Sequence, residues 1–111
     1  MSGKFRAERL ESLMQSELGK LIMREVDIPP GVLVNISNVD ITSDNKSSKI
    51  GVNVYPEDKA DEIIKLLNKS SGRLHYKLIR VLNIRTVPTL EFRYDTGSEN
   101  AAKVEKILME E

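Results

Sequence analysis

The 111-residue sequence contains no cysteine and one histidine, and both shortages exclude whole classes of chemistry. Without cysteine the chain has no disulfide, no thiolate metal site and no cysteine nucleophile. The single histidine excludes every metal or catalytic motif that needs two. No Gly-rich phosphate loop or nucleophile elbow is present, and the carboxylates show no recognised catalytic spacing. We therefore expect no metal, no cofactor and no enzymatic activity.

Long apolar runs are also missing, since none approaches the roughly 20 residues that a membrane-spanning helix requires. Residues 1–13, MSGKFRAERLESL, have charges among their apolar positions, unlike the continuous apolar segment of a secretory signal. The composition, 40% hydrophobic and 31% charged, is typical of a globular protein. Domains commonly run to about 100–150 residues. We expect one cytoplasmic domain over residues 1–111.

The net charge is zero, but positive and negative charges are separated along the chain. Between residues 69 and 93 six cations face one acid, whereas residues 95–111 carry an excess of acids. The six cations are Lys69, Arg73, Lys77, Arg80, Arg85 and Arg93. The chain therefore contains a basic stretch that suits a polyanion, although its net charge is zero.

Hydrophobic spacing predicts most of the secondary structure. A helix is expected over residues 4–25, where apolar residues recur at helical intervals until Pro29 and Pro30 stop it. Its expected buried stripe is Leu10, Leu13, Met14, Leu18, Leu21 and Ile22. Alternating patterns predict strands over residues 32–42 and 49–55, joined as a hairpin, with a bulge near Asn38 where the apolar parity changes. A third strand is expected over residues 89–94, and Ser98 is expected to cap a last helix.

Residues 57–83 form a long helical pattern that carries Ser70, Ser71 and Gly72 in its middle. At about 100° per residue the apolar stripe stays in phase straight through these three residues. Its members are Ala60, Ile63, Ile64, Leu67, Leu74, Leu78, Val81 and Leu82. A loop of arbitrary length would not preserve that phase, so we expect a kinked helix rather than two helices with a loop.

The opposite face of this stretch is basic. Cations gather as the chain approaches and passes Gly72, which leaves no side chain in the way of a phosphate backbone. They are Lys65, Lys69, Arg73, Lys77 and Arg80. Two plainer explanations stay open: a basic end complements the helix dipole, and Gly72 allows close packing against the first helix. We expect Tyr76 to cover apolar surface, His75 to lie at the surface, and Phe5 and Tyr55 to be packing residues.

The segregation of helices from a small sheet predicts an α+β two-layer sandwich. The order of elements resembles a type II KH domain, and the details resemble the bacterial ribosome-binding factor A family, in which an Ala-x-Gly helix kink replaces the Gly-x-x-Gly loop. Here Ser70-Ser71-Gly72 stands at that kink. The segment VPTLEFRYD is similar to that family's P-x-L-x-F-x-Y-D, and ERLESLMQSELGKLI fits its opening helix. The family's usual Asp-Pro-Arg after the first helix is replaced by DIPPGVLV.

The resemblance implies a KH type II-like fold, in the order α-β-β-α-kink-α-β-α, with a three-stranded sheet and helices on one face. It implies a monomeric, non-catalytic assembly factor that binds ribosomal RNA of the small ribosomal subunit, acts in late maturation and 16S rRNA processing, and supports growth in the cold. The expected RNA-binding residues are Lys69, Ser70, Ser71, Gly72, Arg73, Lys77, Arg80 and Arg85. Lys4, Arg6 and Arg9 join them if the fold brings the first helix alongside.

A KH loop with two glycines clamps about four single-stranded nucleotides. The second glycine is missing here, so contacts to phosphates and to the shape of folded RNA are expected instead. The main alternative is a protein-binding adaptor that docks a partner on the kinked helix or the sheet edge. Salt separates the two, because RNA binding weakens steeply as salt rises and apolar docking does not.

Overall fold

The computed structural model describes the backbone of residues 2–95 and the side chains of residues 8–95. The helix expected after Ser98 lies outside these residues. The described elements run in the order α1 (Ser2–Glu25), β1 (Leu33–Ile41), β2 (Ser47–Tyr55), the short 3-10 helix η1 (Glu57–Lys59), α2 (Ala60–Lys69), α3 (Ser71–Leu82) and β3 (Thr89–Tyr94). All the expected elements within residues 2–95 are present. No helix in this part of the chain is long and apolar enough to span a membrane.

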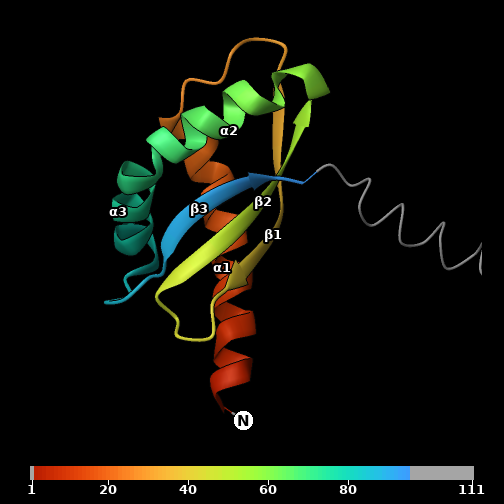
Figure 1. The fold of residues 1–111 in the computed structure, drawn as a ribbon. Helices are drawn as coiled ribbons and strands as arrows, with labels where there is room; N and C mark the ends of the chain where they lie inside the picture. The colour runs from red at the N-terminus through yellow and green to blue at the C-terminus, as the bar shows by residue number, and fades with distance from the viewer. Residues whose placement is uncertain (1, 96–111) are drawn as a thin grey trace, which may run out of the picture.

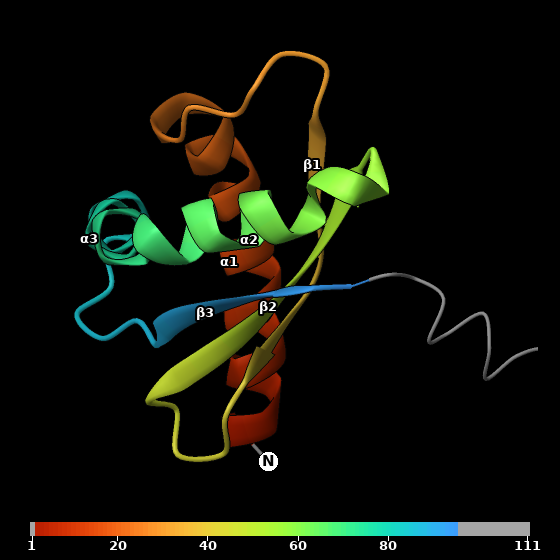
Figure 2. The same cartoon turned by 45° about the horizontal axis from the view of Figure 1, so that its top comes forward.

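The three strands form one mixed sheet in the order β1-β2-β3. β1 and β2 are an antiparallel hairpin, whereas β2 and β3 are parallel, with Ile50 opposite Phe92. Parallel neighbours need a crossover, and η1, α2 and α3 supply it. Figures 1 and 2 show α1, α2 and α3 on the same side of the sheet. The two layers are therefore one of helices and one of strands, as expected.

The bulge expected near Asn38 is confirmed. The register of β1 against β2 shifts between Ile36 and Asn38, which leaves Ser37 as the extra residue. Gly51 lies opposite this bulge, and a side-chain carbon built there would overlap Asn38 Oδ1 and lie 2.8 Å from Ser37 Oγ. A larger residue at position 51 would therefore have to displace the side chains of Asn38 and Ser37 at the bulge.

The core lies between the helices and the inner face of the sheet. Every element of the two layers contributes to it, and its most completely buried large side chains are Phe92, Met14, Leu18, Leu21, Ile22, Ile50, Ile63, Leu67, Leu74 and Leu78. Two members of the expected stripes are instead largely exposed, Leu13 at 43% and Val81 at 46%. Both lie at the margin of their stripe, where no described element covers them.

Helix side chains occupy the outer backbone groups of both edge strands. On β1, the amide Nε2 of Gln15 donates to Ile36 O (3.1 Å), and Glu11 Oε2 accepts from the Ile41 N–H (3.0 Å). On β3, the side chain of Asn68 bonds the backbone of Phe92. These contacts fix α1 and the end of α2 on the sheet, and they partly cover edges that would otherwise attract a further strand.

The other face of the sheet carries no helix in the described part of the chain, and polar side chains cover most of it. Lys49, Glu91 and Arg93 are exposed there, and the guanidinium of Arg93 beside Glu91 lowers the pKa of that carboxyl. Tyr55 was expected to pack but is 69% exposed, opposite the equally exposed Leu33. The reason is strand parity, which places both on this open face.

Candidate nucleic-acid interface

The kink lies at Ser70, the single residue between α2 and α3. Its φ of −91° and ψ of 0° keep the chain in the right-handed region. The N–H of Ser70 donates to Leu66 O (3.0 Å) and Leu67 O (3.1 Å), and Ser70 O accepts from the N–H of Leu74 (2.9 Å). Figure 2 shows α2 lying across the view while α3 is seen end-on. The expected kinked helix is confirmed, with no loop between its two arms.

Gly72 is not at the kink itself but is the second residue of α3. It is exposed, and a side-chain carbon added there would meet no atom within 4 Å. One of the two plainer explanations, close packing against the first helix, is therefore wrong. Nothing within the described part of the fold requires a glycine at this position.

Two polar side chains that the sequence pattern did not single out tie the joint to β3 and to the loop before it. Asn68, two residues before the kink, bonds both the N–H and the carbonyl of Phe92. His75, expected at the surface, is half-buried, and its Nε2 lies 2.7 Å from Val87 O. Both contacts join residues far apart in the sequence, so no local signal could have found them.

The exposed side of α3 is basic, as expected. Leu74 and Leu78 are buried, and the residues on the opposite side of the helix by the 100° rule are Arg73, Tyr76 and Arg80. Lys69 is exposed at the end of α2, Lys77 is half-buried at the margin, and Arg85 is exposed just beyond α3. We call the five cations Lys69, Arg73, Lys77, Arg80 and Arg85 the basic face.

None of the basic face is neutralised by an acid within residues 8–95. The ion pairs in this part of the chain are Lys20–Glu17, within α1, and Arg93–Glu91, on the open sheet face. Exposed cations without an acidic partner raise the local positive potential.

Arg73 has a second contact that the sequence did not predict. Its Nη2 donates to the carbonyl oxygen of Glu25, the last residue of α1, at 2.6 Å. The final carbonyls of a helix lack intrahelical partners, so this bond caps α1 and satisfies one of them. The guanidinium remains exposed, which leaves donors on its other nitrogens available to a ligand.

Tyr76 does not cover apolar surface as expected but stands 56% exposed. Arg80 lies one helical turn further on, and its Nη1 donates to Tyr76 Oη at 3.0 Å. The guanidinium carbon of Arg80 is 5.7 Å from the centre of the tyrosine ring, within cation–π range. An aromatic ring and a planar cation are thus presented together on the basic face.

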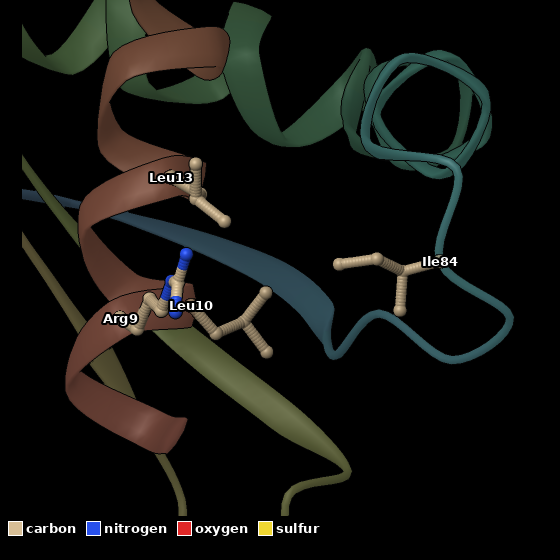
Figure 3. Close-up of a pocket in the computed structure, with 4 residues that line it drawn as sticks. All are labelled: Arg9, Leu10, Leu13 and Ile84. Carbon is tan, nitrogen blue, oxygen red and sulfur yellow. The ribbon is translucent and has the colours of Figure 1, made fainter. Parts of the chain in front are cut away.

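α1 contributes Arg9 beside the end of α3. Arg9 lines an apolar pocket of about 240 Å³ together with Leu10, Leu13 and Ile84. Figure 3 shows Ile84, which follows α3, pointing across the pocket toward the two leucines of α1. Arg9 therefore lies across the pocket from the residue that precedes Arg85. The side chains of Lys4 and Arg6 lie outside the described residues.

The groups that the basic face presents are cations, backbone amides and one aromatic ring. Among residues 8–95 no group of three or more histidines or carboxylates could hold a metal ion. Ser71, Gly72 and Arg73 form the first turn of α3, where the helix dipole favours an anion. The backbone amides of this turn, together with Lys69 and Arg73, suit a phosphate group.

Comparison with known proteins gives consistent matches. The family model described as ribosome-binding factor A matches residues 6–108. A protein of Pseudomonas syringae named ribosome-binding factor A is 38% identical over 113 aligned positions, which cover 96% of this chain and 82% of that protein.

Solved structures share the fold. The crystal structure of ribosome-binding factor A from Thermus thermophilus has a TM-score of 0.68 and 23% identity, over 79% of this chain and 94% of that one. A homology model of the Thermus thermophilus factor, fitted into a cryo-EM map of its complex with the 30S, has a TM-score of 0.55 and 22% identity, over 73% of this chain and 90% of that one. The α+β fold described above is the KH-like fold of these proteins.

Proposed function

The chain belongs to the ribosome-binding factor A family, and on that premise we propose that it binds ribosomal RNA of the small ribosomal subunit through the basic face. The observation that carries the proposal is the set of exposed cations around the kink that no acid of the described chain neutralises. A related factor has been placed in a 30S complex, which is the assembly this surface would meet.

The proposed contacts are to phosphates rather than to base sequence. Lys69, Arg73, Lys77 and Arg80 hold phosphates along α2 and α3, and Arg85 extends the track past the end of α3. Ser70 and Ser71 are half-buried and contribute backbone, and exposed Gly72 allows the RNA backbone to approach closely. Arg9 adds a cation from α1 at the same end as Arg85.

Further parts of the proposal follow from family membership. The protein acts in the cytoplasm as a monomeric, non-catalytic factor during late small-subunit maturation and 16S rRNA processing, and it supports growth in the cold. The chemistry of the site supports a binding role, because its described groups are cations, backbone amides and one aromatic ring.

The first test is salt dependence. Binding to immature small-subunit particles should fall linearly on a log–log plot against salt, with a slope of about −0.7 to −0.9 for each phosphate contact. A slope near zero would reject an RNA interface on the basic face. That result would favour the adaptor alternative, for which the apolar pocket between Arg9 and Ile84 is the available surface. The sheet edges suit an adaptor less, because helix side chains already bond them.

The second test is charge reversal. Arg73→Glu, Lys77→Glu and Arg80→Glu together should abolish co-sedimentation with immature particles. A control with the same change in net charge reverses Lys46, Lys49 and Lys59, which are exposed away from α3. Because Arg73 also caps α1, the double variant Lys77→Glu, Arg80→Glu is measured as well, with thermal unfolding of each protein. Co-sedimentation of a folded double or triple variant at the wild-type level would refute the proposal.

A further inference from the structure

We propose that Tyr76 and Arg80 form a stacking platform for one unpaired RNA base, and that Gly72 keeps the space beside the ring open for it. This inference rests on the proposed function, because it adds a base contact to a surface otherwise assigned to phosphates. It also differs from the two-glycine KH clamp, which the chain lacks. The observations that carry it are the exposed ring, the guanidinium beside it and the empty space at Gly72.

The spacing of the three residues aligns them along α3. Gly72, Tyr76 and Arg80 are four residues apart, so they lie one above another on one side of the helix. Side chains on a helix lean toward its N-terminus. That lean directs the ring of Tyr76 toward the turn that contains Gly72. The guanidinium of Arg80 approaches the ring from the C-terminal side.

The two sides of the ring differ. On the C-terminal side, Arg80 is hydrogen-bonded to the tyrosine hydroxyl at 3.0 Å, with its guanidinium carbon 5.7 Å from the ring centre. On the N-terminal side, the position of a Gly72 side chain has no atom within 4 Å. A flat base needs such a gap beside the ring, and any residue with a side chain at position 72 would narrow it.

A purely structural role does not account for the ring. Tyr76 is 56% exposed, and its hydrogen bond and its cation–π contact are both with Arg80, which is itself exposed. Unpaired bases in RNA-binding proteins stack on aromatic rings and on arginine planes, so the pair offers two suitable surfaces. Arg73, three residues before Tyr76, and the first amides of α3 lie where the phosphate of the same nucleotide would be held.

The direct test compares two single-stranded oligomers of equal length, one oligouridylate and one abasic ribose-phosphate. Wild-type protein should bind the oligouridylate roughly 5- to 100-fold more tightly, since stacking contributes on that scale. Tyr76→Ala should lose this preference while keeping its affinity for the abasic oligomer and its salt dependence. Tyr76→Phe should keep the preference, and Tyr55→Ala, which removes a more exposed ring elsewhere, should change nothing.

Two further variants sharpen the test. The chain contains no tryptophan, so Tyr76→Trp introduces a single tryptophan, whose fluorescence should be quenched by oligouridylate and not by the abasic oligomer. Gly72→Gln fills the open space without adding charge and should abolish the base preference. Quenching that is equal for both oligomers would contradict the platform.

The outcomes separate this inference from the proposed function. If wild-type protein binds both oligomers equally, or Tyr76→Ala keeps the preference, the platform is refuted while salt-dependent phosphate binding stands. If neither oligomer binds and immature particles bind without salt dependence, both proposals fail together.

Discussion

Asn68 pairs with Phe92 as a neighbouring strand would. Its Nδ2 donates to Phe92 O at 3.0 Å, and its Oδ1 accepts from the Phe92 N–H at 2.8 Å. β3 is an edge strand, so these backbone groups have no strand partner on that side. Because Asn68 lies two residues before the kink, this pair sets where α3 begins relative to the sheet and hence where the basic face points.

Asn68→Ala should lower the free energy of unfolding by about 1–3 kcal/mol, since it removes both bonds and leaves two backbone groups of β3 unpaired. Asn68→Asp should also destabilise, because a carboxylate can accept from the N–H but faces the carbonyl oxygen without a proton to donate. Urea unfolding measures both. Asn35→Ala, on the open face of the sheet, is the control and should stay within about 0.5 kcal/mol of wild type. An Asn68→Ala protein as stable as wild type would show that solvent replaces the pair at no cost.

Arg73 should show two separable roles. Arg73→Ala removes the cap on Glu25 O and should cost about 1 kcal/mol of stability, at the low end for a charged donor because the site is exposed. The same change removes a phosphate contact and should lower RNA affinity and make the salt slope shallower by about one contact. Lys69→Ala is the matched control. It should weaken RNA binding and make the salt slope shallower, but it should not cost the stability that the cap on Glu25 provides. An unchanged salt slope in Arg73→Ala would show that Arg73 caps α1 and contacts no phosphate.

The kink could be predicted from sequence because the fold preserves helical phase through it. Ser70 stays in the right-handed region and keeps hydrogen bonds on both sides, so the apolar stripe of α2 continues into α3. The spacing of apolar residues in the sequence therefore indicates the continuous helical phase directly. The bulge at Ser37 was visible for the same reason, as a change of parity in an otherwise alternating strand.

Long-range polar contacts and burial at the margins could not be predicted in this way. Asn68 and Arg73 bond backbone groups 24 and 48 residues away, and nothing in their neighbourhood in the sequence indicates those acceptors. Leu13 and Val81 fit their helical stripes but are exposed, because a stripe predicts a direction and not the presence of a covering element. The basic face was found because it depends on helical spacing alone.

Gly72→Ala tests whether the glycine is kept for binding. The added carbon meets no atom within 4 Å, and alanine is favoured over glycine within a helix by up to about 1 kcal/mol. We therefore expect a higher melting temperature with weaker binding to immature particles. The kink should persist, since it lies at Ser70. Wild-type binding by a more stable Gly72→Ala protein would remove the proposed reason for the glycine.

Gly51→Ala should lower stability, whereas Gly72→Ala should raise it. The two glycines differ in what surrounds them. At Gly51 the added carbon would overlap Asn38 Oδ1 and crowd Ser37 Oγ, so both side chains must move, and Ser37 would disturb its hydrogen bond to Asp95. Overpacking of this kind typically costs about 1–3 kcal/mol. Gly19→Ala, inside α1 with nothing within 4 Å, is the control and should gain up to about 1 kcal/mol. Unfolding in urea measures both changes. Relief by the double variant Gly51→Ala, Asn38→Ala would identify the bulge as the source of the clash, whereas additive losses would place it elsewhere.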